Sequence, residues 1–104
     1  MAGLPEQSDL LGGLLSRAIE IGADELEIEC KDGLEEVYAL KDNTGLRIAA
    51  FEANSKPASS LLEQLYAIGK NGKRIQISGA VYRVRVTTYD SFGEDAFRVG
   101  ISRV

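Results

Sequence analysis

The stretch AVYRVRVTTY at residues 80–89 alternates between apolar and polar side chains. Such a period of two predicts a β-strand with one face on a core and the other face in water. Turn residues on both sides, Ser78-Gly79 and residues 90–94, predict that the neighbouring strands run antiparallel to it. The face expected to be buried carries Tyr82, Val84, Val86 and Thr88, and the opposite face carries Arg83, Arg85 and Thr87.

The rest of the C-terminal half is predicted to form one helix and two further strands. The strands are expected over residues 74–77 and residues 96–103, each with alternating apolar side chains. Before them, an apolar stripe at helical spacing predicts a helix with Ser55 as its N-cap and Pro57 in its first turn. Asn71-Gly72 is expected to end this helix.

The N-terminal half repeats the same order of elements. An amphipathic helix is predicted over about residues 8–21, with Ser8 or Asp9 as its N-cap and Gly22 as a left-handed stop. Three strands are expected at residues 25–30, 35–41 and 46–53, joined by a turn at residues 31–33 and a four-residue hairpin turn at residues 42–45.

The predicted order is therefore helix, three strands, helix, three strands. Hairpins within each half indicate a mostly antiparallel sheet of six strands, and two one-sided helices indicate a second layer on one of its faces. We therefore expect an α+β two-layer fold of order αβββαβββ. The length of 104 residues predicts a single domain over residues 1–104, and residues 1–7 are expected to be flexible.

The composition argues against several classes of function. The chain has no His, which excludes His-based catalysis and the usual Cys/His zinc sites, and it has no Walker A string. Its 16 acidic and 12 basic residues give a net charge of -4, which disfavours a general nucleic-acid binder. No apolar run is long enough to span a membrane, and the single Cys30 fits a reducing cytoplasm. We expect a cytoplasmic protein that is not an enzyme and has no cofactor and no metal.

An acidic stripe is predicted on the polar face of the first strand, where Glu25, Glu27 and Glu29 alternate with apolar residues. Three interpretations stay open: a divalent-cation site, a solvated stripe, and ion pairs with arginines of neighbouring strands. Cys30 is expected on the apolar face of that strand, as a thiol with nothing to activate it. Outward positions are expected for Arg83, Arg85, Arg98 and Arg103.

Arg83, Arg85 and Arg98 are the candidate binding residues. The last two strands are predicted to pair as a hairpin, which brings arginines of both strands to one surface. Clustered arginines clamp phosphate groups bidentately, and they are also enriched at protein interfaces. The residues themselves leave a nucleotide and a protein partner open.

Two segments resemble the N-terminal domain of the motor ATPases that drive type II secretion and type IV pilus assembly or retraction. The resemblance covers most of the chain from about Leu10 onward. In AIEIGADELEIE, residues 18–29, the matching positions are Ala18, Ile19, Gly22, Ala23 and Asp24, and Glu27 stands where the family has His. In YRVRVTTYDSFGEDAFRV, residues 82–99, they are Arg85, Val86, Thr87, Thr88, Gly93, Glu94 and Arg98.

The resemblance implies a PAS-like sheet and a place beside a RecA-like ATPase domain. It also implies that Arg85 and Arg98 lie near a nucleotide at the domain or subunit boundary. The family's Arg-x-Arg before a hairpin is missing, since residues 37–41 read VYALK.

We therefore expect a non-catalytic protein-interaction module that binds a motor ATPase, either a separate partner or an ATPase half of its own, without nucleic-acid binding or membrane insertion. Two alternatives stay open. One is a PAS-like sensor with an apolar pocket of roughly 300 Å³ or more between helix and sheet. The other is a nucleotide-binding regulator that does not hydrolyse its ligand.

Overall fold

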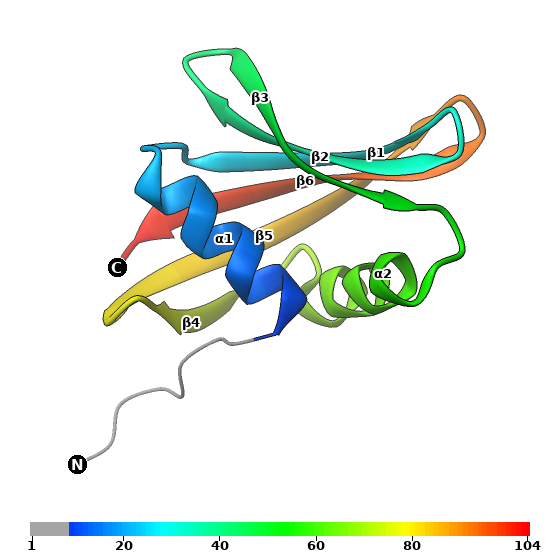
Figure 1. Cartoon of the computed structure of the whole chain (residues 1–104). Coiled ribbons are helices and arrows are strands. Elements are labelled where there is room, and N and C mark those ends of the chain that lie inside the picture. Colours follow the sequence, from blue (N-terminus) through cyan, green and yellow to red (C-terminus); the bar gives the residue numbers. More distant parts are fainter. Residues whose placement is uncertain (1–8) are drawn as a thin grey trace.

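A computed structural model describes residues 9–104, which form one six-stranded sheet and two helices (Figure 1). Ser8 as an N-cap and the expected flexibility of residues 1–7 lie outside the described residues. No helix in the described part is long and apolar enough to cross a membrane. The elements are α1 (Leu10–Glu20), β1 (Glu25–Lys31), β2 (Leu34–Lys41), β3 (Thr44–Glu52), α2 (Lys56–Ile68), β4 (Lys73–Ile77), β5 (Ala80–Ser91) and β6 (Glu94–Arg103).

The sheet has the strand order β3-β2-β1-β6-β5-β4, and every neighbouring pair is antiparallel. The first and last strands pair at its centre, where Leu26 lies opposite Val99 and Ile28 opposite Phe97. This pairing joins the two halves of the chain. The predicted α+β class and the six-stranded antiparallel sheet are confirmed.

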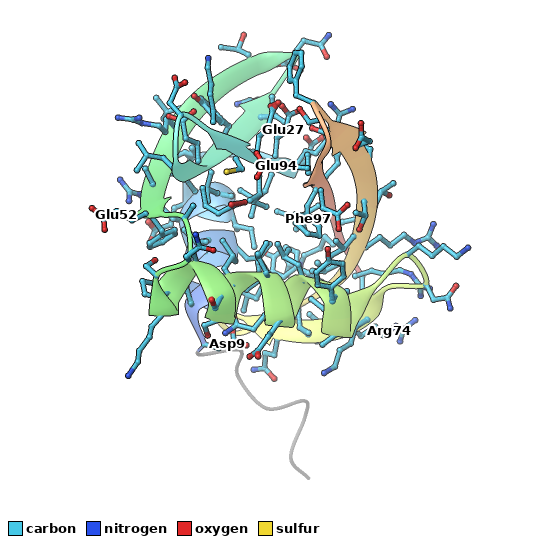
Figure 2. The ribbon with its side chains drawn as sticks, turned by 90° about the vertical axis from the view of Figure 1, so that its right-hand side faces the viewer. Asp9, Glu27, Glu52, Arg74, Glu94 and Phe97 are labelled. Carbon is cyan, nitrogen blue, oxygen red and sulfur yellow. The ribbon has the colours of Figure 1, made fainter. Side chains whose placement is uncertain are left out.

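Both helices lie on the same, concave side of the sheet (Figure 1). In Figure 2 the strands form an arc, and α2 lies across the open side of that arc. Apolar side chains from both layers fill the space between them and exclude water, which is the main stabilising term of the fold. The largest fully buried side chains are Phe97, Leu11, Leu15, Leu26, Ile28, Leu61, Leu65, Ile77, Val37, Val84 and Val99.

Four two-residue turns close the hairpins, and both residues of each turn have positive φ angles. This backbone twist matches the twist of the flanking strands. The predicted four-residue turn at residues 42–45 is therefore wrong, and so is the predicted long turn at residues 90–94. In each hairpin the strands stay paired up to the residues directly before and after the two turn residues. The turn pairs are Asp32-Gly33, Asp42-Asn43, Ser78-Gly79 and Phe92-Gly93.

The helix ends are set by capping residues. Asp9 caps α1, its side chain accepting a hydrogen bond from the backbone N–H of Gly12 at 2.8 Å, and Ser55 caps α2. The predicted end of α2 at Asn71-Gly72 is wrong, because the helix already ends at Ile68 and Gly69, whose φ is 67°, is its C-cap. The Gly69 carbonyl accepts a hydrogen bond from the N–H of Val86 at 3.0 Å, so the turn after α2 is fixed to β5.

The β2–β3 pair contains an irregularity that leaves Ile48 without a partner in the ladder. The Ile48 carbonyl instead accepts a hydrogen bond from Nη1 of Arg17 on α1, at 2.8 Å. A bulge of this kind bends a strand and increases its twist. It therefore contributes to the curl that brings β3 toward the helices.

Candidate functional site

The convex face of the sheet is not covered by any helix of residues 9–104 (Figure 1). Residues on that face alternate with the core residues along each strand. The predicted candidate groups Glu25, Glu27, Glu29, Arg83, Arg85 and Arg98 all have this outward register. The uncovered face is therefore where the charged candidates gather.

Arg98 is held by the acidic stripe. Its Nη2 lies 2.9 Å from Oε2 of Glu27, and its Nε lies 3.8 Å from Oε2 of Glu25. The hydrogen bond that Arg98 donates to Glu27 and the negative charge of Glu25 raise the pKa of Arg98. Cross-strand ion pairing, one of the three interpretations of the stripe, is confirmed for these two carboxylates.

The third carboxylate of the stripe, Glu29, does not contact Arg98. It accepts a hydrogen bond from the Ser91 hydroxyl at 2.7 Å, across the sheet on β5. Within residues 9–104, no three Cys, His, Asp or Glu side chains are grouped so that they could hold a metal ion. The stripe therefore acts through hydrogen bonds and ion pairs to its neighbours.

Arg83 and Arg85 lie on one wall of a surface hollow of about 440 Å³ whose other lining residues include Asp24, Glu25 and Gly100. Gly100 lies directly opposite Arg85 in the ladder and has no side chain to fill the space. Neither arginine forms an ion pair within the described part of the chain.

The guanidinium of Arg83 is only partly satisfied. Its Nη2 donates a hydrogen bond to the backbone carbonyl of Asn71 at 3.2 Å. Its Nε is buried and has no hydrogen-bond partner among residues 9–104. A buried donor without an acceptor is unfavourable, so a carboxylate or phosphate that reached Nε would stabilise this side chain.

The structure brings Arg83 and Arg85 together but separates Arg98 from them. Arg98 lines a second hollow of about 420 Å³, toward the β2–β3 turn. Glu25 lines both hollows and so lies between Arg98 and the pair Arg83 and Arg85. The three predicted binding residues therefore belong to two adjacent surface regions.

Arg103 does not have the outward position that the sequence predicted. It lies on the same face of β6 as Val99 and Ile101, which are buried. Its guanidinium lies over the ring of Tyr82, 5.7 Å from the centroid. This cation–π contact at the end of the strand holds Arg103 on the side of the helices.

Arg74 also belongs to the basic group of Arg83 and Arg85, although it is not among the binding residues predicted from the sequence. It lies on edge strand β4 directly opposite Arg83, and both are on the uncovered face. Its outward position could have been predicted, because Ile75 and Ile77 on the same strand are buried and the residues between and before them face the other way. Two arginines opposite each other repel, so this arrangement favours an acidic ligand between them.

A separate cavity of about 510 Å³ lies between α2 and the turns of two hairpins. The PAS-like sensor alternative requires a pocket at such a place. The cavity is not purely apolar, because several carboxyl groups line it. The residues around it are Cys30, Glu35, Ala53, Asn54, Ala58, Ser59, Leu62, Tyr66, Gly93, Glu94, Asp95 and Phe97.

Cys30 is a poor nucleophile in this cavity. Burial, together with the negative charges of Glu35 and Glu94, raises the pKa of its thiol to about 11. We therefore expect its alkylation by iodoacetamide at pH 8 to be about tenfold slower than that of a thiol with an ordinary pKa. The thiolate is roughly a hundredfold scarcer, but a thiolate of higher pKa reacts faster.

The same thiol in the urea-unfolded chain gives the reference rate. In the folded protein the rate is expected to rise steadily with pH up to about pH 11. A rate that levels off near pH 9 would contradict the assignment of a raised pKa.

No protein-family model matches the chain, and a search of curated proteins found no match.

Proposed function

We propose that the chain is a non-catalytic protein-interaction module of the cytoplasm that binds a RecA-like motor ATPase through the uncovered face of its sheet. Its PAS-like relationship to the N-terminal domain of secretion and pilus motors is part of this proposal and is supported by the matching segments at residues 18–29 and 82–99. The observation that carries the proposal is the pair of half-buried Arg83 and exposed Arg85, which line a hollow and have no ion-pair partner in residues 9–104.

Charge on this face supports a protein partner that places carboxylates against Arg83 and Arg85. Glu25 and Glu27 are engaged by Arg98, and Glu36 is engaged by Arg47 at 2.9 Å, so these carboxylates are already paired. Arg74, Arg83 and Arg85 are left as an uncompensated basic row. Arginine is enriched at protein interfaces and dominates many of their binding energies.

A nucleotide fits the hollow less well than a protein surface does. Asp24 and Glu25 line the hollow together with the arginines, and their carboxylates oppose a polyphosphate. A protein surface can place carboxylates against Arg83 and Arg85 and a basic group against the acidic wall. We therefore propose a partner surface of mixed sign, and expect ATP at millimolar concentration to leave the Arg85 side-chain NMR signal unchanged.

The proposal predicts that charge reversal on β5 weakens binding to such an ATPase. We expect the double variant Arg83→Glu, Arg85→Glu to bind at least about tenfold more weakly, because facing carboxylates would then repel. The measurement is isothermal titration calorimetry with the ATPase domain of a secretion or pilus motor, after size-exclusion chromatography has shown co-elution.

The matched control is the double variant Lys56→Glu, Lys70→Glu. It changes the net charge by the same amount, but both lysines are exposed near the two ends of α2, on the helix layer. Its affinity is expected to stay close to that of the wild type. Failure to co-elute at tens of micromolar, or equal weakening by both double variants, would count against the proposal.

A further inference from the structure

Glu35 occupies a core position at the floor of the cavity beneath α2. It lies opposite Cys30 in the β1–β2 ladder and on the same side of β2 as the buried residues Val37 and Ala39. It is only 5% exposed. Glutamate is almost never this buried in a protein unless a partner compensates its charge.

No cation compensates this carboxylate within the described part of the chain. Its carboxylate has no Lys or Arg nitrogen within 4.0 Å there, and the residue opposite it in the ladder is Cys30, whose thiol is only a weak donor. Burial and the nearby Glu94 raise the pKa of Glu35, and the Cys30 thiol opposes that shift. The buried carboxylate therefore lacks the positive group that would stabilise its charge.

The rim of the cavity is also acidic. Glu94 and Asp95 follow the β5–β6 turn, and both line the cavity. The hydroxyl of Tyr66 donates a hydrogen bond to Asp95, which raises the pKa of Tyr66. Figure 2 shows Glu94 and Phe97 inside the arc, above α2. The entrance is thus negative, and an anion would be repelled from it.

Aromatic and aliphatic groups form the rest of the wall. The rings of Phe97 and Tyr66 pack edge to face with centroids 5.2 Å apart, and Leu62 and Ala58 lie beside them. The volume of about 510 Å³ is within the range of small-molecule sites. An apolar wall next to an uncompensated carboxylate matches a molecule with an apolar body and a positive head.

We propose that this cavity binds a small organic cation, an amine whose ammonium group contacts Glu35 and whose apolar body packs against Leu62 and Tyr66. A metal ion is disfavoured, because within residues 9–104 no three ligating groups are suitably placed for one. This site lies on the helix side of the sheet and is independent of the partner surface proposed above.

The test is an NMR titration of the full chain with phenethylamine at neutral pH, where the amine is positively charged. Amide signals of the cavity residues are expected to shift in a saturable way. The uncharged analogue 2-phenylethanol has a similar shape and is expected to bind at least about tenfold more weakly, because it cannot form the charge-assisted hydrogen bond.

Three variants decide which carboxylate recognises the amine. Glu35→Gln is expected to weaken phenethylamine binding at least about tenfold, and Glu94→Gln at the rim less so. Glu52→Gln is the matched control, because Glu52 is exposed and points away from the cavity (Figure 2), and its affinity should equal that of the wild type. If the Glu35→Gln variant does not fold, the proposal still predicts that Glu94→Gln binds phenethylamine more weakly than Glu52→Gln does.

Several results would overturn the proposal. These are no shift of cavity amides at tens of millimolar phenethylamine, equal binding of 2-phenylethanol, and unchanged affinity in a folded Glu35→Gln variant. Tighter binding of Ca²⁺ alone than of the amine would also reject an organic cation as the ligand.

Discussion

Replacing Phe97 with alanine is expected to lower the free energy of unfolding by about 3–5 kcal/mol. Phe97 is fully buried on the central strand β6, where it lies opposite Ile28 on β1 and Thr88 on β5. Its ring also packs against Tyr66 of α2. Removing the ring therefore leaves a cavity where both layers meet, and the loss is a large part of the 5–15 kcal/mol typical of a domain.

Phe92→Ala is the matched control for this variant. Phe92 stands in the β5–β6 turn and is fully exposed, so its removal is expected to change stability by less than about 0.5 kcal/mol. Urea denaturation followed by circular dichroism measures both variants. Similar losses for the two would mean that Phe97 is not a core residue.

Replacing Gly72 with alanine is expected to cost about 3 kcal/mol. Gly72 has a φ of 79°, which costs an alanine about 1 kcal/mol. An added Cβ would also lie 2.7 Å from Cγ of Arg85 and 2.9 Å from the carbonyl oxygen of Val84. The second contact is with backbone, which cannot move aside without disturbing β5, and overpacking of this kind costs about 1–3 kcal/mol more.

Gly33→Ala separates the two contributions. Gly33 has nearly the same φ, 78°, but nothing lies within 4 Å of its added Cβ. We therefore expect a loss of only about 1 kcal/mol in the same urea experiment. Equal losses at the two glycines would contradict the close approach of residue 72 to β5.

The regular elements were predictable because their signals are local. A window of about ten residues shows the alternation of β1 and β5 and the apolar stripe of α2. Ser55 is the N-cap of α2, as expected for a serine directly before a helix. The turns were less predictable. Phe92 has a φ of 52°, a conformation that bulky residues rarely adopt, so the sequence does not indicate a two-residue turn there.

The sites were harder to predict because they depend on contacts between distant segments. The alternation along the strand correctly predicted that Arg83 and Arg85 lie on the outward face. Only the β1–β6 register shows that Arg98 forms ion pairs with Glu25 and Glu27 and so does not join Arg83 and Arg85. Glu35 was missed altogether. It is the second residue of its strand, where a polar residue is ordinary, and its burial requires α2 and the β5–β6 turn to close over it.

The most direct test of the proposed function observes the arginine side chains themselves in the presence of the motor ATPase domain. Arginine Nε–H NMR signals report each guanidinium separately. We predict that the signals of Arg83 and Arg85 shift on binding, while those of Arg17 and Arg103, on the helix side, do not. Binding that shifts only Arg17 and Arg103, or that leaves all four signals in place, would contradict docking through the uncovered face of the sheet.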